Sequence, residues 1–263
     1  MNIDIFIPVR LDSVRLPKKH LEKINNIPII EHLVNRLKNC KNFRKIVICT
    51  TNNPVDDILI DFLKEKKILY FRGEEKNILK RFLDAANEFD TDIIIDIEGD
   101  KLFTEPSFVD KIILEMKSNN YDFIIGNNSS SIFDPNDHFI HGIIPSGIRV
   151  SCIKKIIALS NSKNMETGYK ELFINNSIIK KKFFVLNTDK LQIPKNLRLT
   201  IDYPEDLDFA KQLFKKLEIN FTYTDILNVL KNNPKFLKIT ENLHEKWFKN
   251  YEKEISNNLW HLL

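Results

Sequence analysis

Strand-like and helix-like segments alternate along the first half of the chain, and this alternation constrains the fold most. Short β-branched runs are followed, four times between residues 3 and 117, by stretches with apolar residues at helical spacing. Repeated strand–helix order favours a parallel sheet with helices on both faces. The predicted strands are 3–9, 45–50, 68–71, 92–97 and 121–125, and the predicted helices are 27–37, 54–65, 75–89 and 107–117.

The alternation breaks at residues 127–145, a stretch rich in Asn, Ser, Asp and Pro that we interpret as a long loop or lid. The predicted fold is therefore a doubly wound α/β domain over residues 1–235, with a small β-rich insertion at about 127–186 and a helical tail over 236–263. Further predicted strands are 147–151, 178–186 and 197–200, and further predicted helices are 166–174, 204–217, 225–230 and 241–263.

Composition excludes several classes of protein. The apolar fraction of 43% and the charged fraction of 29% are typical of a globular domain. No apolar run approaches the roughly 20 residues of a membrane helix, and the opening MNIDIFIPVR resembles a strand more than a signal peptide. The net charge of +4 is modest, and lysines and acids share the helical segments, so we expect no nucleic-acid partner.

The three cysteines indicate a reducing compartment. Cys40, Cys49 and Cys152 are far apart, odd in number and free of any C-x-x-C pattern. Such residues are typical of buried thiols, so we expect a cytoplasmic protein.

A basic segment directly follows the first predicted strand. Ligands of parallel sheets bind beyond the carboxyl ends of the strands, so this segment is well placed for a nucleotide. The chain has only 6 glycines and no glycine-rich phosphate loop, so phosphates here would need charged side chains. The segment predicts a phosphate-binding loop, with an ordinary basic surface loop as the alternative. Its cationic and hydroxyl side chains are Arg10, Ser13, Arg15, Lys18 and Lys19.

Two carboxylates follow predicted strands elsewhere in the chain. Asp100 comes after the apolar run 92–97, and Asp202 comes after the predicted strand 197–200. Mg²⁺ takes one or two carboxylates together with phosphate oxygens, so these two residues form a plausible metal clamp. The alternative for Asp100 is a helix cap. Glu205 and Asp206 are better explained as acids in the first turn of a helix.

The chain resembles a known family. The matching stretches occur in order over nearly the whole chain up to about residue 235, and they are similar to the cytidylyltransferases that make CMP-KDO and CMP-sialic acids. The similarity is closest to the spore-coat polysaccharide type. The stretches are IPVRLDSVRLPKKHLEKINNIPIIEH, IVICTTNNPVDDILIDFL, FRGEEKNILKRFLDAA, DIIIDIEGDKLFTEPSFVD and LRLTIDYPEDL, followed by the NNP before residue 235.

The resemblance implies a CTP-dependent nucleotidyltransferase with Mg²⁺ as cofactor and a dimer as the usual assembly. An acceptor oxygen would attack the α-phosphorus of CTP and expel pyrophosphate, a reaction that depends on positioning and charge neutralisation. By position, Arg10, Ser13, Arg15 and Lys19 correspond to the family's residues for the CTP phosphates. The implied nucleotide-binding residues also include Arg72 and Arg81. The implied metal ligands are Asp100 and Asp202. The implied catalytic residues are Arg10, Arg15, Lys19 and Asp100.

The acceptor is less constrained, because the chain departs from the family near the expected acceptor pocket. Lys101 stands where a proline-containing stretch is usual, and Arg149 stands where acids are usual. We expect an acidic sugar, with Lys101, His141 and Arg149 facing it. A phosphate or phosphonate acceptor is the alternative, and Asn77, which replaces an acid, keeps a non-catalytic nucleotide-binding homologue open.

Two further features carry weaker hypotheses. His138 and His141 form either a metal pair or, as we prefer, a lid contact or plain surface. The aromatic side chains of the tail are expected to pack against the domain or a second subunit. These aromatic residues are Trp247, Phe248, Tyr251 and Trp260.

Overall fold

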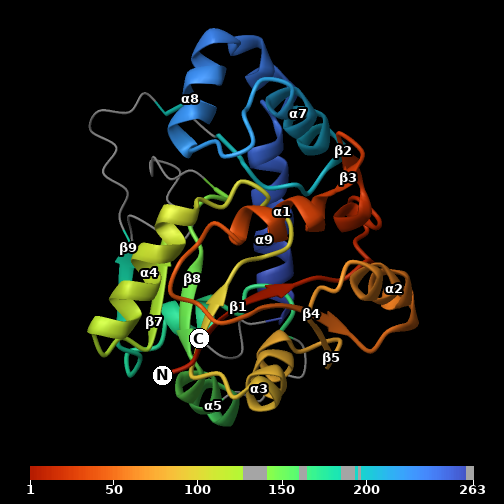
Figure 1. Cartoon of the computed structure of the whole chain (residues 1–263). Helices are drawn as coiled ribbons and strands as arrows, with labels where there is room; N and C mark the ends of the chain where they lie inside the picture. The colour runs from red at the N-terminus through yellow and green to blue at the C-terminus, as the bar shows by residue number, and fades with distance from the viewer. Residues whose placement is uncertain (127–140, 160–164, 185–192, 195–196, 259–263) are drawn as a thin grey trace.

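The computed structural model describes residues 1–126, 141–159, 165–184, 193–194 and 197–258. Within these residues a central sheet has the strand order β5-β4-β1-β6-β8-β7-β9, and only β8 runs antiparallel to its neighbours (Figure 1). The predicted, mostly parallel sheet is confirmed. Its strands are β1 Ile3–Pro8, β4 Ile46–Thr51, β5 Tyr70–Gly73, β6 Ile93–Asp96, β7 Phe123–Gly126, β8 Ser146–Arg149 and β9 Lys181–Phe184.

Helices cover both faces of this sheet, and a small hairpin precedes the first of them. The helices are α1 Ile29–Leu37, α2 Asp57–Glu65, α3 Ile78–Phe89, α4 Pro106–Ser118, α5 Val150–Leu159, α6 Glu171–Ile174, α7 Pro204–Phe214, α8 Tyr223–Asn232 and α9 Leu243–Asn258. The hairpin strands are β2 Lys23–Ile24 and β3 Ile27–Pro28, and the short 3₁₀ helices are η1 Lys19–Leu21, η2 Pro54–Asp56 and η3 Pro234–Ile239.

Two hydrophobic cores result from the alternation of side chains along each strand. In β6, Ile93 and Ile95 face the core under α1, α2 and α4, whereas Ile94 faces the core under α3, α5 and α6. Figure 1 shows α3 and α5 below the sheet and α7 and α8 above it. The strands are apolar on both faces because both faces are covered.

Local signals set the helix that follows Asp202. α7 begins with Pro204 in its first turn, and the Asp206 carboxylate accepts hydrogen bonds from the backbone N–H groups of Asp202 and Tyr203 at 2.9 and 3.0 Å. These bonds fix the turn that carries Asp202. The prediction that Asp206 is a first-turn helix acid is confirmed.

Several predicted elements differ from the structure. The helix predicted at 166–174 is only the four-residue α6, Glu171–Ile174. The segment 197–200 is not a strand and forms only a bridge between His141 and Arg198. The first helix starts at Ile29, because Ile27 and Pro28 pair with the preceding strand of the hairpin. The strand predicted at 147–151 ends at Arg149 and continues directly as α5, a helix that we did not predict.

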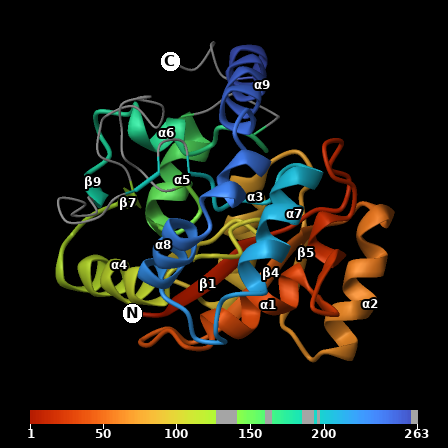
Figure 2. The same ribbon diagram turned by 90° about the horizontal axis from the view of Figure 1, so that it is seen from above.

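Most of the described part of the tail forms one long helix, α9, which follows η3. α9 runs from the side of α7 and α8 toward α6 (Figure 2). No helix in the described part of the chain has the length and apolar character needed to cross a membrane.

Candidate active site

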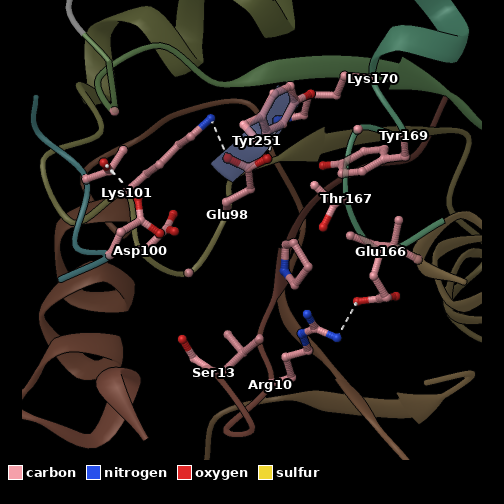
Figure 3. Close-up of a pocket in the computed structure, with 18 of the residues that line it drawn as sticks. Arg10, Ser13, Glu98, Asp100, Lys101, Glu166, Thr167, Tyr169, Lys170 and Tyr251 are labelled. Carbon is pink, nitrogen blue, oxygen red and sulfur yellow. Dashed lines mark hydrogen bonds and ion pairs between the residues drawn. The ribbon is translucent and has the colours of Figure 1, made fainter. Parts of the chain in front are cut away.

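A cavity of about 450 Å³ opens beyond the carboxyl ends of β1 and β6 (Figure 3). This is the edge where open parallel sheets bind their ligands. Its walls come from α9 and from several parts of the chain that are far apart in sequence. These parts lie within residues 8–20, 78–81, 98–101, 125–126, 141–146, 166–170 and 198–202.

Lys19 brings the two predicted metal ligands together. Its Nζ lies 2.9 Å from Asp100 Oδ2 and 3.3 Å from Asp202 Oδ1, and the lysine is only 7% exposed. Two guanidinium groups also hold Asp202: Arg15 Nη2 at 3.0 Å and Arg198 Nη2 at 2.9 Å. The sequence predicted Lys19, Asp100 and Asp202 as site residues, but not that Lys19 lies between the two carboxylates.

The environment of this cluster shifts the pKa values of the two carboxyl groups in opposite directions. Burial opposes ionisation of Asp202, but Lys19, Arg198 and Arg15 outweigh it and hold the pKa of Asp202 well below its usual range. Burial raises the pKa of Asp100. The positive charge of Lys19 offsets only part of this rise, and the negative charge of Asp202 adds to it. Burial lowers the pKa of Lys19, but the two carboxylates raise it above its ordinary value, so this lysine stays charged.

One oxygen of Asp100 stands apart. Asp100 Oδ1 is buried and has no hydrogen-bond partner among the described residues. A buried carboxylate oxygen without a donor is costly, so this atom is suited to a cation or a ligand donor.

A second ion network forms the floor of the cavity beside the first. Lys170 Nζ lies 2.8 Å from Glu98 Oε1 and 3.2 Å from Asp96 Oδ2, and Lys101 Nζ lies 2.7 Å from Glu98 Oε2. The Tyr169 hydroxyl donates to Asp96 at 2.6 Å. Burial opposes ionisation of Glu98, but the two lysines lower its pKa well below the usual range. Lys101 thus reaches the cavity as predicted, with its charge already paired.

The nucleotide-binding residues implied by the resemblance divide into two groups. Arg10, Ser13 and Arg81 line the cavity, and Glu166 lies between the arginines, 3.2 Å from Arg81 Nη2 and 3.9 Å from Arg10 Nη1 (Figure 3). This carboxylate orients both guanidinium groups.

Arg72 is placed elsewhere. Its side chain donates to the carbonyls of Thr51 and Asn53 and pairs with Asp57 at 2.7 Å, so it braces the turn after β4. It does not line the cavity. The predicted role of Arg72 in holding the nucleotide is therefore not supported by its position.

The prediction for Arg149 is wrong. Arg149 pairs with Ile93 at the start of β6, whereas the cavity lies beyond the end of that strand. Its guanidinium donates to the carbonyls of Tyr121, Met116 and Asn119 around the end of α4. The sequence pattern identified the strand correctly but not its antiparallel direction, which reverses the end at which Arg149 lies.

His141 lies in the cavity wall, as predicted, while His138 lies outside the described residues. The His141 ring centroid is 5.6 Å from that of Trp247, and burial, reinforced by the charge of Arg198, lowers the pKa of His141 to about 3. Across the described ranges, no group of three or more His, Cys, Asp or Glu residues could hold a metal. His141 is thus a neutral wall residue at pH 7.

Gly99 and His20 pack closely behind the carboxylates. A Cβ on Gly99 would lie 2.7 Å from Val9 Cγ2 and 2.9 Å from His20 Cε1, so only glycine fits there without a shift. His20 Nδ1 lies 3.2 Å from the Gly99 carbonyl, and burial lowers the pKa of His20 to about 3. A neutral imidazole can donate its one proton to that carbonyl.

Sequence reasoning missed several residues of this site. Arg198 had a usable signal, since it stands four residues before Asp202 in a segment already singled out. Glu166, Tyr169 and Lys170 had none, because only the tertiary fold carries their segment to β6 and to the segment after β1.

The family model described as cytidylyltransferase matches residues 5–232. The chain belongs to the cytidylyltransferase family. It is a CTP-dependent nucleotidyltransferase, as the resemblance implied. This cytidylyltransferase is 27% identical over 249 residues to the spore coat polysaccharide biosynthesis protein SpsF of Bacillus subtilis, covering 89% of this chain and 96% of that protein.

A second relative and a solved structure are also similar to this chain. An 8-amino-3,8-dideoxy-manno-octulosonate cytidylyltransferase of a Shewanella species is 26% identical over 147 residues, covering 51% of this chain and 58% of that protein. A cytidylyltransferase structure from Leptospira borgpetersenii superposes with a TM-score of 0.78 at 24% identity, covering 90% of this cytidylyltransferase and 96% of that chain. At this identity the structural likeness shows the fold.

Proposed function

We propose that this enzyme transfers CMP from CTP to a small acidic sugar and releases pyrophosphate, with Mg²⁺ as cofactor. The observation that carries the proposal is the convergence of Asp100 and Asp202 at one end of the cavity, ringed by Lys19, Arg15 and Arg198. The name of one relative, an octulosonate cytidylyltransferase, supports an acidic sugar as the acceptor, and the name of another, a spore coat polysaccharide biosynthesis protein, supports a role in polysaccharide synthesis.

The residues fit a magnesium ion. Mg²⁺ needs one or two carboxylates and completes its octahedron with water and substrate phosphates, so a large cluster of protein ligands is unnecessary. Asp100 supplies a buried oxygen without a hydrogen bond, and Asp202 is held ionised. Bound there, the ion would neutralise charge on the phosphates of CTP.

The protein side chains then position the triphosphate. Arg10, Arg15 and Lys19 point into the cavity from the segment after β1, and Arg81 lies opposite with Glu166. Guanidinium and ammonium groups stabilise the charge that moves to the leaving oxygen when the α-phosphorus is attacked. The acceptor hydroxyl oxygen forms the new bond to phosphorus, the bond to the bridging oxygen breaks, and the hydroxyl proton passes to solvent.

The acceptor carboxylate is assigned to the end of the cavity that contains Lys101. Lys101 and Lys170 share Glu98, and Lys170 also pairs with Asp96, so the two cations at this end already contact two carboxylates. A singly charged acceptor disturbs these pairs less than a doubly charged one, which favours a carboxylic acid over a phosphate or phosphonate. The predicted homodimer and the cytoplasmic location stay predictions.

Pyrophosphate release with CTP and Mg²⁺ tests the proposal. The acceptor panel contains 3-deoxy-ulosonic and sialic acids, their neutral parent sugars, phosphate monoesters and phosphonates. We expect release with at least one acidic sugar and none with its neutral counterpart. Release confined to phosphate or phosphonate acceptors would establish the alternative, and CTP binding without release from any acceptor would favour a non-catalytic homologue.

A further inference from the structure

The C-terminal helix contributes to the cavity although it lies beyond the matched family region. The family model ends at residue 232, and α9 begins at Leu243. Three side chains of α9 nevertheless line the cavity: Trp247, Tyr251 and Glu254. They are spaced four and three residues apart, which places them on one face of the helix.

This face is held against the cluster around Asp202. The ring planes of Trp247 and Tyr251 stack with centroids 5.2 Å apart and an interplanar angle of 20°. Arg198, which binds Asp202, has its Cζ 5.2 Å from the centre of the Trp247 ring. Asn250 donates to the Tyr203 hydroxyl at 3.0 Å, so the helix is also fixed to the residue after Asp202.

Tyr251 lies toward the proposed acceptor end. Figure 3 shows Tyr251 near Glu98 and Lys101, away from Arg10 and Ser13 at the other end. Both aromatic side chains are half-buried, whereas Glu254 is exposed at the rim. A carboxylate at the rim accepts hydrogen bonds from hydroxyl groups.

We infer that α9 forms the acceptor-binding wall of this cytidylyltransferase, where Tyr251, held by its stacking on Trp247, packs against the C–H face of a sugar ring and Glu254 accepts a hydrogen bond from a sugar hydroxyl. Flat aromatic rings offer apolar area at low entropic cost, which suits the weakly polar face of a ring with hydroxyls at its edge. The inference rests on the proposed function, because it takes the acceptor to be a sugar.

The test compares two glutamates of the same helix. Glu254→Gln removes the charge at the cavity rim, and Glu252→Gln makes the same change at an exposed position that does not line the cavity. With CTP, Mg²⁺ and the acidic sugar that the wild type uses, Glu254→Gln is expected to raise the acceptor KM about tenfold, the size of one charged hydrogen bond. The KM for CTP is expected to stay within about twofold, and Glu252→Gln to change neither value.

Tyr251→Ala tests the aromatic surface in the same assay. We expect the acceptor KM to rise about tenfold or more while the KM for CTP stays unchanged, and Tyr251→Phe, which keeps the ring, to behave like the wild type. An unchanged acceptor KM in both Glu254→Gln and Tyr251→Ala would overturn the inference. A rise in the KM for CTP alone would overturn it too, because it would assign α9 to the nucleotide. Failure of the proposed function is distinct, since it appears as no release from acidic sugars by the wild type.

Discussion

The Lys19 ammonium group lies 2.9 Å from Asp100 Oδ2, so a residue from the segment after β1 neutralises a carboxylate that follows β6. The same ammonium group lies 3.3 Å from Asp202. A lysine in this position competes with a divalent cation for the two carboxylates. Lys19 is therefore a counter-ion already present at the proposed metal site.

Lys19→Met is expected to abolish turnover and to strengthen the effect of Mg²⁺ on stability. Without the lysine, two buried carboxylates repel each other, and a cation that binds only the folded state then stabilises the protein more. Thermal unfolding with and without Mg²⁺ measures this. We expect a larger rise in Tm for the variant than for the wild type, and an equal rise in both would contradict a metal site between Asp100 and Asp202.

Asp100→Asn and Asp202→Asn are both expected to lose pyrophosphate release, but with different costs in stability. Asp202 is shared by Lys19, Arg15 and Arg198, so its amide removes a buried negative charge that three cations contact and lowers the free energy of unfolding by about 3–5 kcal/mol. The cost for Asp100→Asn is smaller, because Asp100 shares only Lys19 with that cluster. Urea unfolding and turnover at saturating Mg²⁺ check both statements. Near-normal turnover in either variant would remove that residue from the metal site.

His20 makes the stability of the fold dependent on pH. Its pKa is about 3 in the folded protein against an ordinary value of 6.5, so between these values the unfolded chain binds a proton that the folded chain does not. The free energy of unfolding therefore falls as the pH drops below 6.5. In His20→Gln, the loss of stability between pH 7 and pH 5 is expected to be smaller than in the wild type by up to about 2 kcal/mol. Urea unfolding at the two pH values measures it, and an identical loss in both proteins would contradict a neutral, buried His20.

Arg149 is expected to matter for stability and not for the acceptor. Arg149→Ala removes donors from the carbonyls of Met116, Asn119 and Tyr121, so the free energy of unfolding is expected to fall by about 1–2 kcal/mol. The acceptor KM is expected to stay unchanged. A rise in the acceptor KM at unchanged stability would indicate that Arg149 binds the acceptor, and it would contradict the antiparallel direction of β8.

The parallel part of the fold was predictable because its signals are local. Apolar runs such as 92–97 and helical spacing such as that of α3 depend on neighbouring residues, and the structure confirms both elements. The direction of β8 was not predictable, because it depends on which strands it pairs with. Because β8 runs antiparallel to β6 and β7, Arg149 lies at the opposite end of the sheet from the end predicted.

The carboxylates of the site could be predicted from the sequence, but the residues that bind them could not. The end of β6 pointed to Asp100, since ligand edges of parallel sheets follow a general rule. The strand predicted before Asp202 is absent, so the argument for that residue used an element that does not form. The cations that hold them required three-dimensional information: Arg198 lies in a segment that is not a strand, and Lys170 reaches Asp96 only through the fold. Trp247 and Tyr251 were expected to pack against the domain, and they do so at the cavity itself.

Phosphorus NMR of one reaction mixture tests the central claim most directly. The wild type is incubated with CTP, Mg²⁺ and a 3-deoxy-ulosonic or sialic acid, with ATP, GTP and UTP in parallel. The account predicts free pyrophosphate and a single uncoupled phosphodiester resonance, the signature of a CMP–sugar bond, from CTP in preference to the other three nucleotides. A coupled pair of diphosphate resonances from a phosphate acceptor, or equal product from all four nucleotides, would contradict it.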